Sequence, residues 1–237
     1  MIFNDLLYKL RWSNLTADNP ARLFAPSNII TFVNPANFYS FLQFDPENFD
    51  YIFSDGILLS RFLGEGNIRR SFDFTSLALP FFRHCESFSK KVLVSGGTPN
   101  EADFFAEFVR EQVPNISIAC ISGYSQSSLY LDLKSVLEEY DYLVLSVGHP
   151  FQDRLALQLS ADFPHLCIVT SGAFVSQTSV NSGFYYPEIV DRLNLRWAYR
   201  AFFNKHVFKR LVTSYPIFCF RFFLDTVKLK FGGPNVY

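Results

Sequence analysis

Six short hydrophobic runs alternate with helical patterns between about residue 28 and residue 175. Each run is rich in β-branched or aromatic residues, and several end at Gly or Asp, which is typical of buried strands. Segments with the apolar spacing of helices lie between them, for example residues 100–113 and 127–140. A strand, a turn and a helix in repeated order predict a parallel sheet covered on both faces, which is a doubly wound α/β fold. The expected strands are residues 28–34, 49–55, 90–97, 117–123, 141–148 and 166–174.

The loops that follow these strands are the expected binding site. In a doubly wound sheet, ligands bind outside the carboxyl ends of the strands, where helix N-termini and free backbone amides converge. One such loop contains Gly96 and Gly97 and precedes a helix, so it could bring backbone amides close to a diphosphate. It could equally be a tight turn in which Thr98 or Asn100 caps the helix. The loop matches neither the dinucleotide fingerprint nor the P-loop.

The C-terminal part of the chain differs from the rest in its charge. The whole chain has a net charge of −1, but residues 192–237 hold 9 basic residues and 1 acidic residue, against 12 basic and 21 acidic residues before them. One helical pattern extends to Pro216, and a second extends from there to the Gly-Gly-Pro at 232–234. Four arginines share one helical stripe. They are Arg192, Arg196, Arg200 and Arg210.

Three interpretations of this basic, aromatic-rich segment are open. It could be a helical hairpin that packs on the body of the protein and leaves its arginines in solvent. It could lie in a membrane interface, with its apolar side in lipid and its cations near phosphate groups. It could also track a nucleic acid backbone, although no recognised nucleic-acid motif accompanies it.

Other features restrict the function without defining it. The four cysteines are 35, 47 and 52 residues apart, which predicts buried thiols in a reducing compartment rather than disulfides or a zinc site. His84 and His165 have no neighbours at metal-ligand spacing, so we expect them to be structural or surface residues. The N-terminus does not resemble a secretory signal, and no run approaches the roughly 18 apolar residues of a membrane-spanning helix.

Seven short motifs follow one another along the chain, at the predicted strand ends and in the basic segment. They are "FVNPAN" (32–37), "SDGILLSRFLG" (54–64), "VLVSGGTP" (92–99), "SGY" (122–124), "VLSVGHPFQDRLA" (144–156), "TSGAF" (170–174) and "LNLRWAYR" (193–200). In this order and spacing they resemble the WecG/TagA/CpsF family of bacterial glycosyltransferases, glycosyltransferase family 26. The similarity covers roughly residues 28–225.

The resemblance implies a Rossmann-like sheet of the GT-E type and an inverting transferase that needs no metal cofactor. Members of the family move a sugar from a UDP-sugar to a hydroxyl of a polyprenyl-diphosphate-linked saccharide, in exopolysaccharide, capsule or cell-wall glycopolymer synthesis. The implied division is a catalytic domain at 1–190 and a helical appendage at 191–237. The appendage is expected to dock on the anionic inner face of the cell membrane and to complete the active site. No nucleic acid partner is expected, and a homo-oligomer is compatible with the resemblance.

The resemblance also implies roles for individual residues. Asp55 matches the family's proposed base for the acceptor hydroxyl, although on the residues alone it is a candidate cap of the following helix. Asn34 and Gln152 match residues that position the sugar, and Gln152 is also a candidate helix cap. Arginines of the basic segment are suited to the donor diphosphate. The implied substrate-binding residues are Gly96, Gly97, Gly123, Tyr124, Gly148, Pro150, Gly172, Ala173, Phe174, Arg200, Lys209 and Arg210.

The chain departs from the family pattern at several positions. Phe32 occupies the place of a Thr, with Thr31 one residue earlier, and His149 replaces a Ser. Val175 replaces an Asp, and Tyr185 alters a further motif. These departures favour an exopolysaccharide branch with a different sugar or acceptor. They also keep open a non-catalytic nucleotide-sugar-binding subunit of a polysaccharide assembly complex.

Overall fold

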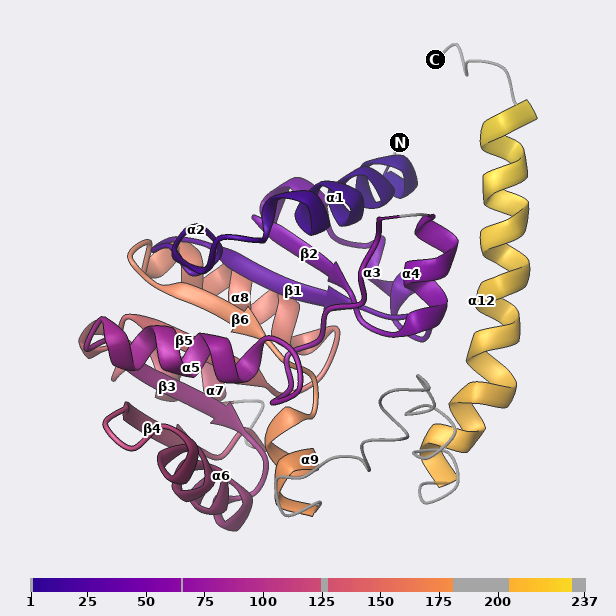
Figure 1. Cartoon of the computed structure of the whole chain (residues 1–237). Helices are drawn as coiled ribbons and strands as arrows, with labels where there is room; N and C mark the ends of the chain where they lie inside the picture. Colours follow the sequence, from indigo (N-terminus) through magenta and orange to yellow (C-terminus); the bar gives the residue numbers. More distant parts are fainter. Residues whose placement is uncertain (1, 65, 125–127, 181–204, 232–237) are drawn as a thin grey trace.

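The computed structural model of the chain describes residues 2–64, 66–124, 128–180 and 205–231. Its centre is a sheet of six parallel strands in the order β2-β1-β6-β5-β3-β4 (Figure 1). All six predicted strands are present, and the predicted Rossmann-like α/β fold is confirmed. The strands are β1 (Ile29–Val33), β2 (Tyr51–Ser54), β3 (Lys91–Gly96), β4 (Ser117–Ile121), β5 (Tyr142–Ser146) and β6 (Cys167–Thr170).

Helices cover both faces of the sheet and divide the core into two hydrophobic clusters. In β1, Ile30 and Phe32 belong to one cluster, and Ile29 and Val33 belong to the other, because successive side chains of a strand point to opposite faces. Burial on both faces explains why the strands are continuous hydrophobic runs in the sequence. The covering helices are α1 (Ile2–Thr16), α2 (Pro20–Leu23), α3 (Phe38–Phe41), α4 (Ile57–Leu63), α5 (Ala78–Ser87), α6 (Pro99–Gln112), α7 (Leu129–Lys134), α8 (Phe151–Asp162) and α9 (Phe174–Val180), with short 3₁₀ helices η1 (Pro46–Asn48) and η2 (Leu137–Glu139).

The two helices used as examples of the sequence pattern have different outcomes. The segment 100–113 is helical as predicted and forms most of α6. The segment 127–140 was predicted as one helix, but α7 ends at Lys134 and only the 3₁₀ helix η2 follows it. A short 3₁₀ turn of this kind is a common connector after an α-helix.

Within residues 205–231, the part of the basic segment that the structure describes, there is one long helix with no break at Pro216. Helix α12 (Lys205–Phe231) continues through Pro216, so the prediction of a break there was wrong. A proline inside a helix removes one backbone hydrogen bond, and its ring crowds the preceding turn. Tertiary packing compensates for this cost, because Phe218 and Phe222, one turn apart after the proline, are only 1% and 4% exposed.

A cluster of aromatic rings, called the aromatic anchor below, holds α12 against the body of the protein. The ring centroids of Phe218 and Phe38 are 5.4 Å apart in an edge-to-face contact, and those of Phe222 and Phe62 are 5.1 Å apart. Such contacts add to the free energy gained by burying the rings. Figure 1 shows α12 standing beside α3 and α4. The aromatic anchor consists of Phe3, Phe38, Tyr39, Phe62, Phe218 and Phe222.

Polar contacts of Tyr39 reinforce the aromatic anchor. The hydroxyl of Tyr39 donates a hydrogen bond of 2.8 Å to Oδ2 of Asp225, and the guanidinium carbon of Arg221 lies 3.9 Å from the centroid of the same ring. Burial, together with the bond to the Asp225 carboxylate, raises the pKa of the Tyr39 hydroxyl. One residue of the short helix α3 therefore meets both an acidic and a basic residue of α12.

Candidate functional site

A pocket of about 550 Å³ opens at the carboxyl ends of β1, β2, β5 and β6. Its volume lies within the roughly 300–1,000 Å³ range of small-molecule sites. Residue 69, residues 71–73 and three residues of α12 also line the wall, so segments far apart in the sequence meet there. We call it the strand-end pocket. The lining residues on which the chemistry depends are Asn34, Ser40, Asp55, Arg69, His149 and Gln152.

The strand-end pocket gathers the residues that the sequence placed at the ends of these four strands. They are Asn34, Asp55, Gly148, Pro150, Gln152, Gly172, Ala173 and Phe174. The candidates after β3 and β4 do not line it, since those strands lie at the other edge of the sheet. They are Gly96, Gly97, Gly123 and Tyr124. The site residues predicted from the sequence therefore fall into two groups: those that line the strand-end pocket and those in loops outside it.

The three basic candidates of the C-terminal segment are not placed in the pocket by the described residues. Arg200 lies outside the described part of the chain. Lys209 is exposed on α12 and is not among the residues that line the pocket. Arg210 belongs to the same helix, and the position of its side chain is outside the description. Their roles toward a diphosphate stay predictions.

Asp55 follows β2 directly, and its backbone N–H donates a hydrogen bond of 2.7 Å to the carbonyl oxygen of Val33 at the end of β1. The cap position of α4 belongs to Gly56, so the interpretation of Asp55 as the helix cap was wrong. Gly56 has a φ of +103°, a conformation that favours glycine. This turn leaves Asp55 half-buried in the pocket wall, where its carboxylate can meet a ligand.

Asn34 shapes the turn after β1. Its side-chain oxygen accepts hydrogen bonds from the backbone N–H groups of Ala36 (2.9 Å) and Asn37 (3.2 Å). In return, the oxygen of the Asn37 side chain accepts the backbone N–H of Asn34 at 2.6 Å. Since the oxygen of Asn34 is used in this turn, the side-chain NH₂ is the group that Asn34 offers to a ligand.

Gln152 joins two of the loops that form the pocket. It is 3% exposed, and its Oε1 accepts the backbone N–H of Gly172 at 2.9 Å. The cap position of α8 is Pro150, so the interpretation of Gln152 as a helix cap was wrong. Ser146 binds the same loop from the end of β5, since its hydroxyl donates to the carbonyl of Gly172 at 3.3 Å. Gln152 thus fixes the loop after β6, and its contact with a sugar stays a prediction.

The Gly-Gly turn after β3 has a structural explanation. Thr98 caps α6 in a capping box: its hydroxyl accepts the N–H of Glu101, whose carboxylate accepts the N–H of Thr98. A Cβ at Gly96 would lie 2.5 Å from Cβ of Ser146, and one at Gly123 would lie 2.4 Å from Cγ1 of Val147. Close packing of the strand ends therefore requires these two glycines. A role in phosphate binding is not needed to explain them.

The family resemblance puts a Thr at the position of Phe32, and the neighbouring Thr31 cannot supply the missing hydroxyl. Neighbouring residues of a strand face opposite sides of the sheet. Phe32 lines the pocket, whereas Thr31 is fully buried and donates a hydrogen bond of 2.7 Å to Oδ1 of Asp153 in α8. A ring, not a hydroxyl, therefore lies at this point of the pocket wall.

Arg69 is a pocket cation that the sequence analysis missed. Its Nη2 lies 2.8 Å from the hydroxyl of Ser71 and 3.4 Å from Oδ2 of Asp73. Of the lining residues that the structure describes, it is the only Lys or Arg. Its planar fork of donors can bind phosphate oxygens. The only signal for it in the sequence is the adjacent pair Arg69 and Arg70. Their loop follows a helix, not a strand, so it was not expected to reach the site.

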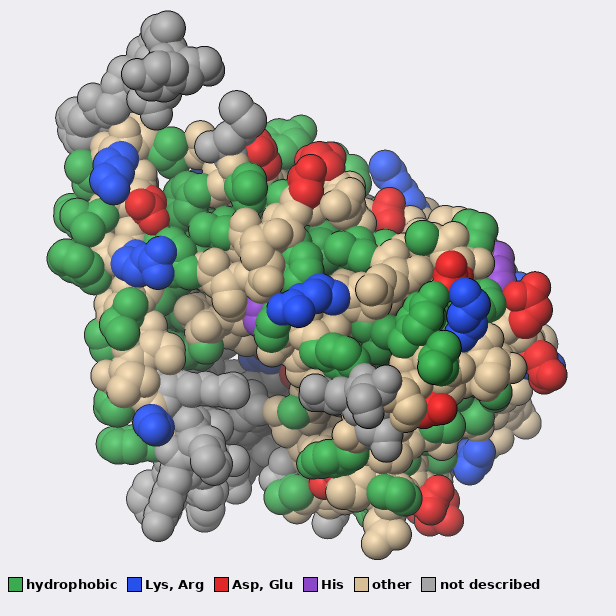
Figure 2. Space-filling model, turned by 180° about the vertical axis from the view of Figure 1, so that it is seen from behind, with side chains coloured by type: hydrophobic (Ala, Val, Ile, Leu, Met, Phe, Trp, Pro, Cys, Tyr) green, Lys and Arg blue, Asp and Glu red, His purple; other side chains and the backbone are tan. Residues whose placement is uncertain are grey.

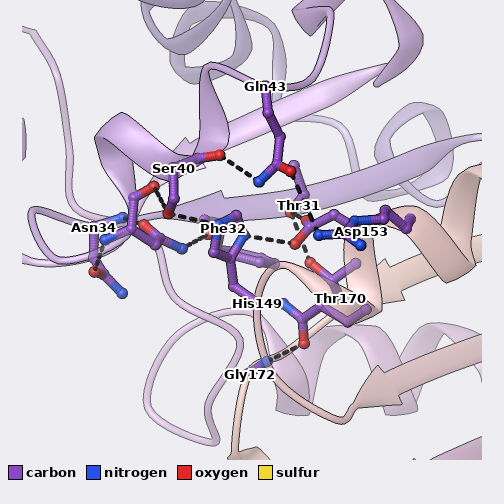
Figure 3. Close-up of polar contacts among 12 residues, drawn as sticks. Thr31, Phe32, Asn34, Ser40, Gln43, His149, Asp153, Thr170 and Gly172 are labelled. Atoms are coloured by element: carbon purple, nitrogen blue, oxygen red, sulfur yellow. Dashed lines mark hydrogen bonds and ion pairs between the residues drawn. The ribbon is translucent and has the colours of Figure 1, made fainter. Parts of the chain in front are cut away.

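A line of hydrogen bonds runs from the centre of the sheet to the pocket wall and was also missed (Figure 3). Thr31 of β1 contacts Thr170 of β6 at 2.8 Å and binds Asp153. Oδ2 of Asp153 lies 2.8 Å from Nδ1 of His149. Nε2 of His149 lies 2.8 Å from the hydroxyl of Ser40 in α3. We call Ser40, His149 and Asp153 the serine–histidine–aspartate line.

His84 has a polar partner inside the fold. Nε2 of His84 lies 3.1 Å from the hydroxyl of Tyr142, and burial lowers the pKa of its ring, which fits the predicted structural role. Across the described ranges, no group of three or more His, Cys, Asp or Glu residues is placed to hold a metal ion.

Two comparisons with known proteins agree with the family resemblance of the sequence. A family model described as "Glycosyl transferase WecG/TagA/CpsF family" matches residues 18–231. A UDP-Gal:alpha-D-GlcNAc-diphosphoundecaprenol beta-1,4-galactosyltransferase from Shigella boydii is 33% identical over 219 residues, which cover 88% of this chain and 91% of that protein. The chain is therefore a glycosyltransferase and belongs to the WecG/TagA/CpsF family.

Proposed function

We propose that this glycosyltransferase moves a sugar from a UDP-sugar to a hydroxyl group of a polyprenyl-diphosphate-linked saccharide, with inversion and without a metal ion. The observation that carries the proposal is the strand-end pocket, which has the carboxylate of Asp55 and the guanidinium of Arg69 in its wall. The Shigella relative supports it, because its name gives a UDP-sugar donor and a diphosphoundecaprenol acceptor. UDP-galactose is therefore the first donor to test.

The pocket residues supply what a direct displacement at the sugar carbon requires. The acceptor hydroxyl loses its proton as the new bond forms, so a base must lie within reach of it. Asp55 provides the carboxylate for this step. The departing UDP gains negative charge, which a fixed cation stabilises, and Arg69 provides one. Gln152 and Asn34 hold the loops between which the sugar would lie.

A non-catalytic nucleotide-sugar-binding subunit is the second candidate. Phe32 favours it, since a ring occupies the place at which the family resemblance puts a hydroxyl. Such a subunit would bind UDP tightly and transfer no sugar to any lipid-linked acceptor. Calorimetric titration with UDP, run beside the transfer assay, separates the two candidates.

Release of UDP is expected to require the lipid-linked acceptor, to be fastest with UDP-galactose and to persist in EDTA. The measurement uses a panel of UDP-sugars, with and without a polyprenyl-diphosphate saccharide, in vesicles. Release that EDTA abolishes would contradict the metal-independent mechanism. Release that is equally fast without an acceptor would show hydrolysis instead of transfer.

The proposal also places α12 on the anionic inner face of the cell membrane, as a peripheral contact. The helix exposes large apolar side chains, among them Ile217, Phe220 and Phe223, which are 59%, 65% and 62% exposed. Lys209 and Lys228 are exposed on the same helix, and Figure 2 shows apolar and basic side chains along it. No helix in the described ranges is long and apolar enough to span a bilayer. Apolar and basic side chains on one helix suit a membrane surface.

The double variant Phe220→Ser/Phe223→Ser is expected to weaken binding to anionic vesicles at least about tenfold. Full burial of one Phe side chain stabilises by roughly 1.5–3 kcal/mol, and about 1.4 kcal/mol corresponds to a factor of ten. Sedimentation with vesicles that contain anionic lipid measures the partition coefficient. Phe88→Ser, at a 60% exposed position on the body, is the control and should leave it unchanged. Equal binding of all three proteins would refute this placement of α12.

A further inference from the structure

Each side chain of the serine–histidine–aspartate line has two polar contacts that fix its position. Asp153 is 1% exposed, and its two oxygens receive the hydroxyl proton of Thr31 and the Nδ1 proton of His149. On the other side, the hydroxyl of Ser40 lies 2.9 Å from the carbonyl oxygen of Asn37 and 2.8 Å from Nε2 of His149.

His149 connects the buried side chain of Asp153 to the pocket wall. Its Nδ1 lies 2.8 Å from Oδ2 of Asp153, and its Nε2 lies 2.8 Å from the hydroxyl of Ser40. A polar group in the core needs such a partner, since burial without a hydrogen bond is costly. Loss of the ring would therefore remove a contact from both Asp153 and Ser40.

Ring packing and a hydrogen bond hold the serine–histidine–aspartate line on the side away from the pocket. The ring of His149 lies beside Phe41 and Phe44, with centroid distances of 6.1 Å to each. Asp153 is held through Thr31 at the centre of the sheet. At the outer end, Ser40 is exposed and belongs to the pocket wall, together with His149. A chain of fixed groups therefore ends in a solvent-accessible hydroxyl inside the site.

We propose that Ser40 binds a hydroxyl group of a bound sugar, and that His149 and Asp153 are positioning residues that orient it. The contacts of the Ser40 hydroxyl with Asn37 and His149 fix its direction and leave its oxygen at least one lone pair for a ligand. A sugar hydroxyl is a donor of the kind that this lone pair accepts. Because the Ser40 hydroxyl is oriented before a sugar binds, less conformational entropy is lost on binding. The inference rests on the proposed transferase function and adds a specificity-determining residue to it.

Ser40→Ala is expected to raise the KM of one substrate about three- to tenfold, the usual effect of losing one hydrogen bond, with kcat within twofold of wild type. A higher KM for the UDP-sugar places the hydroxyl on the donor, and a higher KM for the lipid-linked saccharide places it on the acceptor. Ser40→Thr keeps the hydroxyl and should restore most of the affinity. Steady-state kinetics with each substrate varied in turn provide the measurement.

Ser135→Ala is the matched control. Ser135 is exposed and, like Ser40, donates to the carbonyl three residues earlier, but it lies in the segment after α7, outside the strand-end pocket. Its loss should leave both KM values unchanged. His149→Gln should raise the same KM as Ser40→Ala and add little to it in the double variant, because residues that act through one another are not additive.

Three results would overturn the inference. Unchanged KM values for both substrates in Ser40→Ala, with normal transfer by the wild type, would remove Ser40 from the site and leave the proposed function intact. A fall in melting temperature and kcat without a change in KM would show a purely structural tie between α3 and α8. A wild-type protein that transfers no sugar would overturn the proposed function and this inference with it.

Discussion

Asp55→Asn is expected to reduce kcat by about 10²–10⁴-fold, the range that general base catalysis contributes. The substitution keeps the size and the local backbone of the residue but removes the carboxylate that would take the acceptor proton. Binding of UDP should change little, because Arg69, the proposed partner of the diphosphate, is untouched. Transfer rates, a calorimetric titration with UDP and the melting temperature, measured on the same preparation, provide the test.

Asp132→Asn serves as the control, since Asp132 is an exposed carboxylate on α7 and does not line the strand-end pocket. It should transfer sugar at the wild-type rate. Full transferase activity of a well-folded Asp55→Asn protein would remove Asp55 as the base. The next carboxylate to test in the pocket would then be Asp73, which is paired with Arg69.

Phe218→Ala is expected to detach α12 from the body of the protein without unfolding the sheet. Truncation of a fully buried Phe costs about 3–5 kcal/mol, and Phe218 is 1% exposed against rings of the aromatic anchor. Opening of α12 should therefore become about 10²–10³ times more frequent. Hydrogen exchange of the backbone amides in 205–231 measures this directly. Activity should fall as well, because Leu211, Ser214 and Tyr215 of α12 line the pocket.

Phe220→Ala is the matched control for the exchange measurement. It removes the same side chain from the same helix, at a position that is 65% exposed. In the absence of vesicles, its amide protection should equal that of the wild type. If Phe218→Ala keeps full protection over 205–231, or if protection is lost over the strands as well, the aromatic anchor does not act as a separate unit.

The sheet could be predicted from the sequence because its physical cause is local. A strand buried on both faces must be hydrophobic at nearly every position, and the run "YLVLS" of β5 is buried throughout. The break at Pro216 was predicted wrongly for the opposite reason. The intrinsic effect of a proline is local, whereas the burial of Phe218 and Phe222 that offsets it depends on rings from α3 and α4.

The candidate site was predictable only in part. Asn34, Asp55 and Gln152 could be found because each follows a strand and lies in a recognisable motif. The bond between Ser40 and His149 joins residues 109 positions apart, and that between Thr31 and Asp153 joins residues 122 positions apart. No pattern along the chain indicates such a pair before the fold is known. Arg69 was missed because its loop enters the pocket from outside the row of strand ends.

Helix α3 is only four residues long, yet two consecutive residues of it have separate tasks. Tyr39 holds α12 through Asp225, and Ser40 meets His149 in the pocket. The two residues are neighbours in the chain, so their backbones move together. A movement of α12 that displaces Tyr39 would therefore displace Ser40 too, so the proposed contact of α12 with a membrane surface would change the geometry of the proposed sugar site without any contact to the sugar itself.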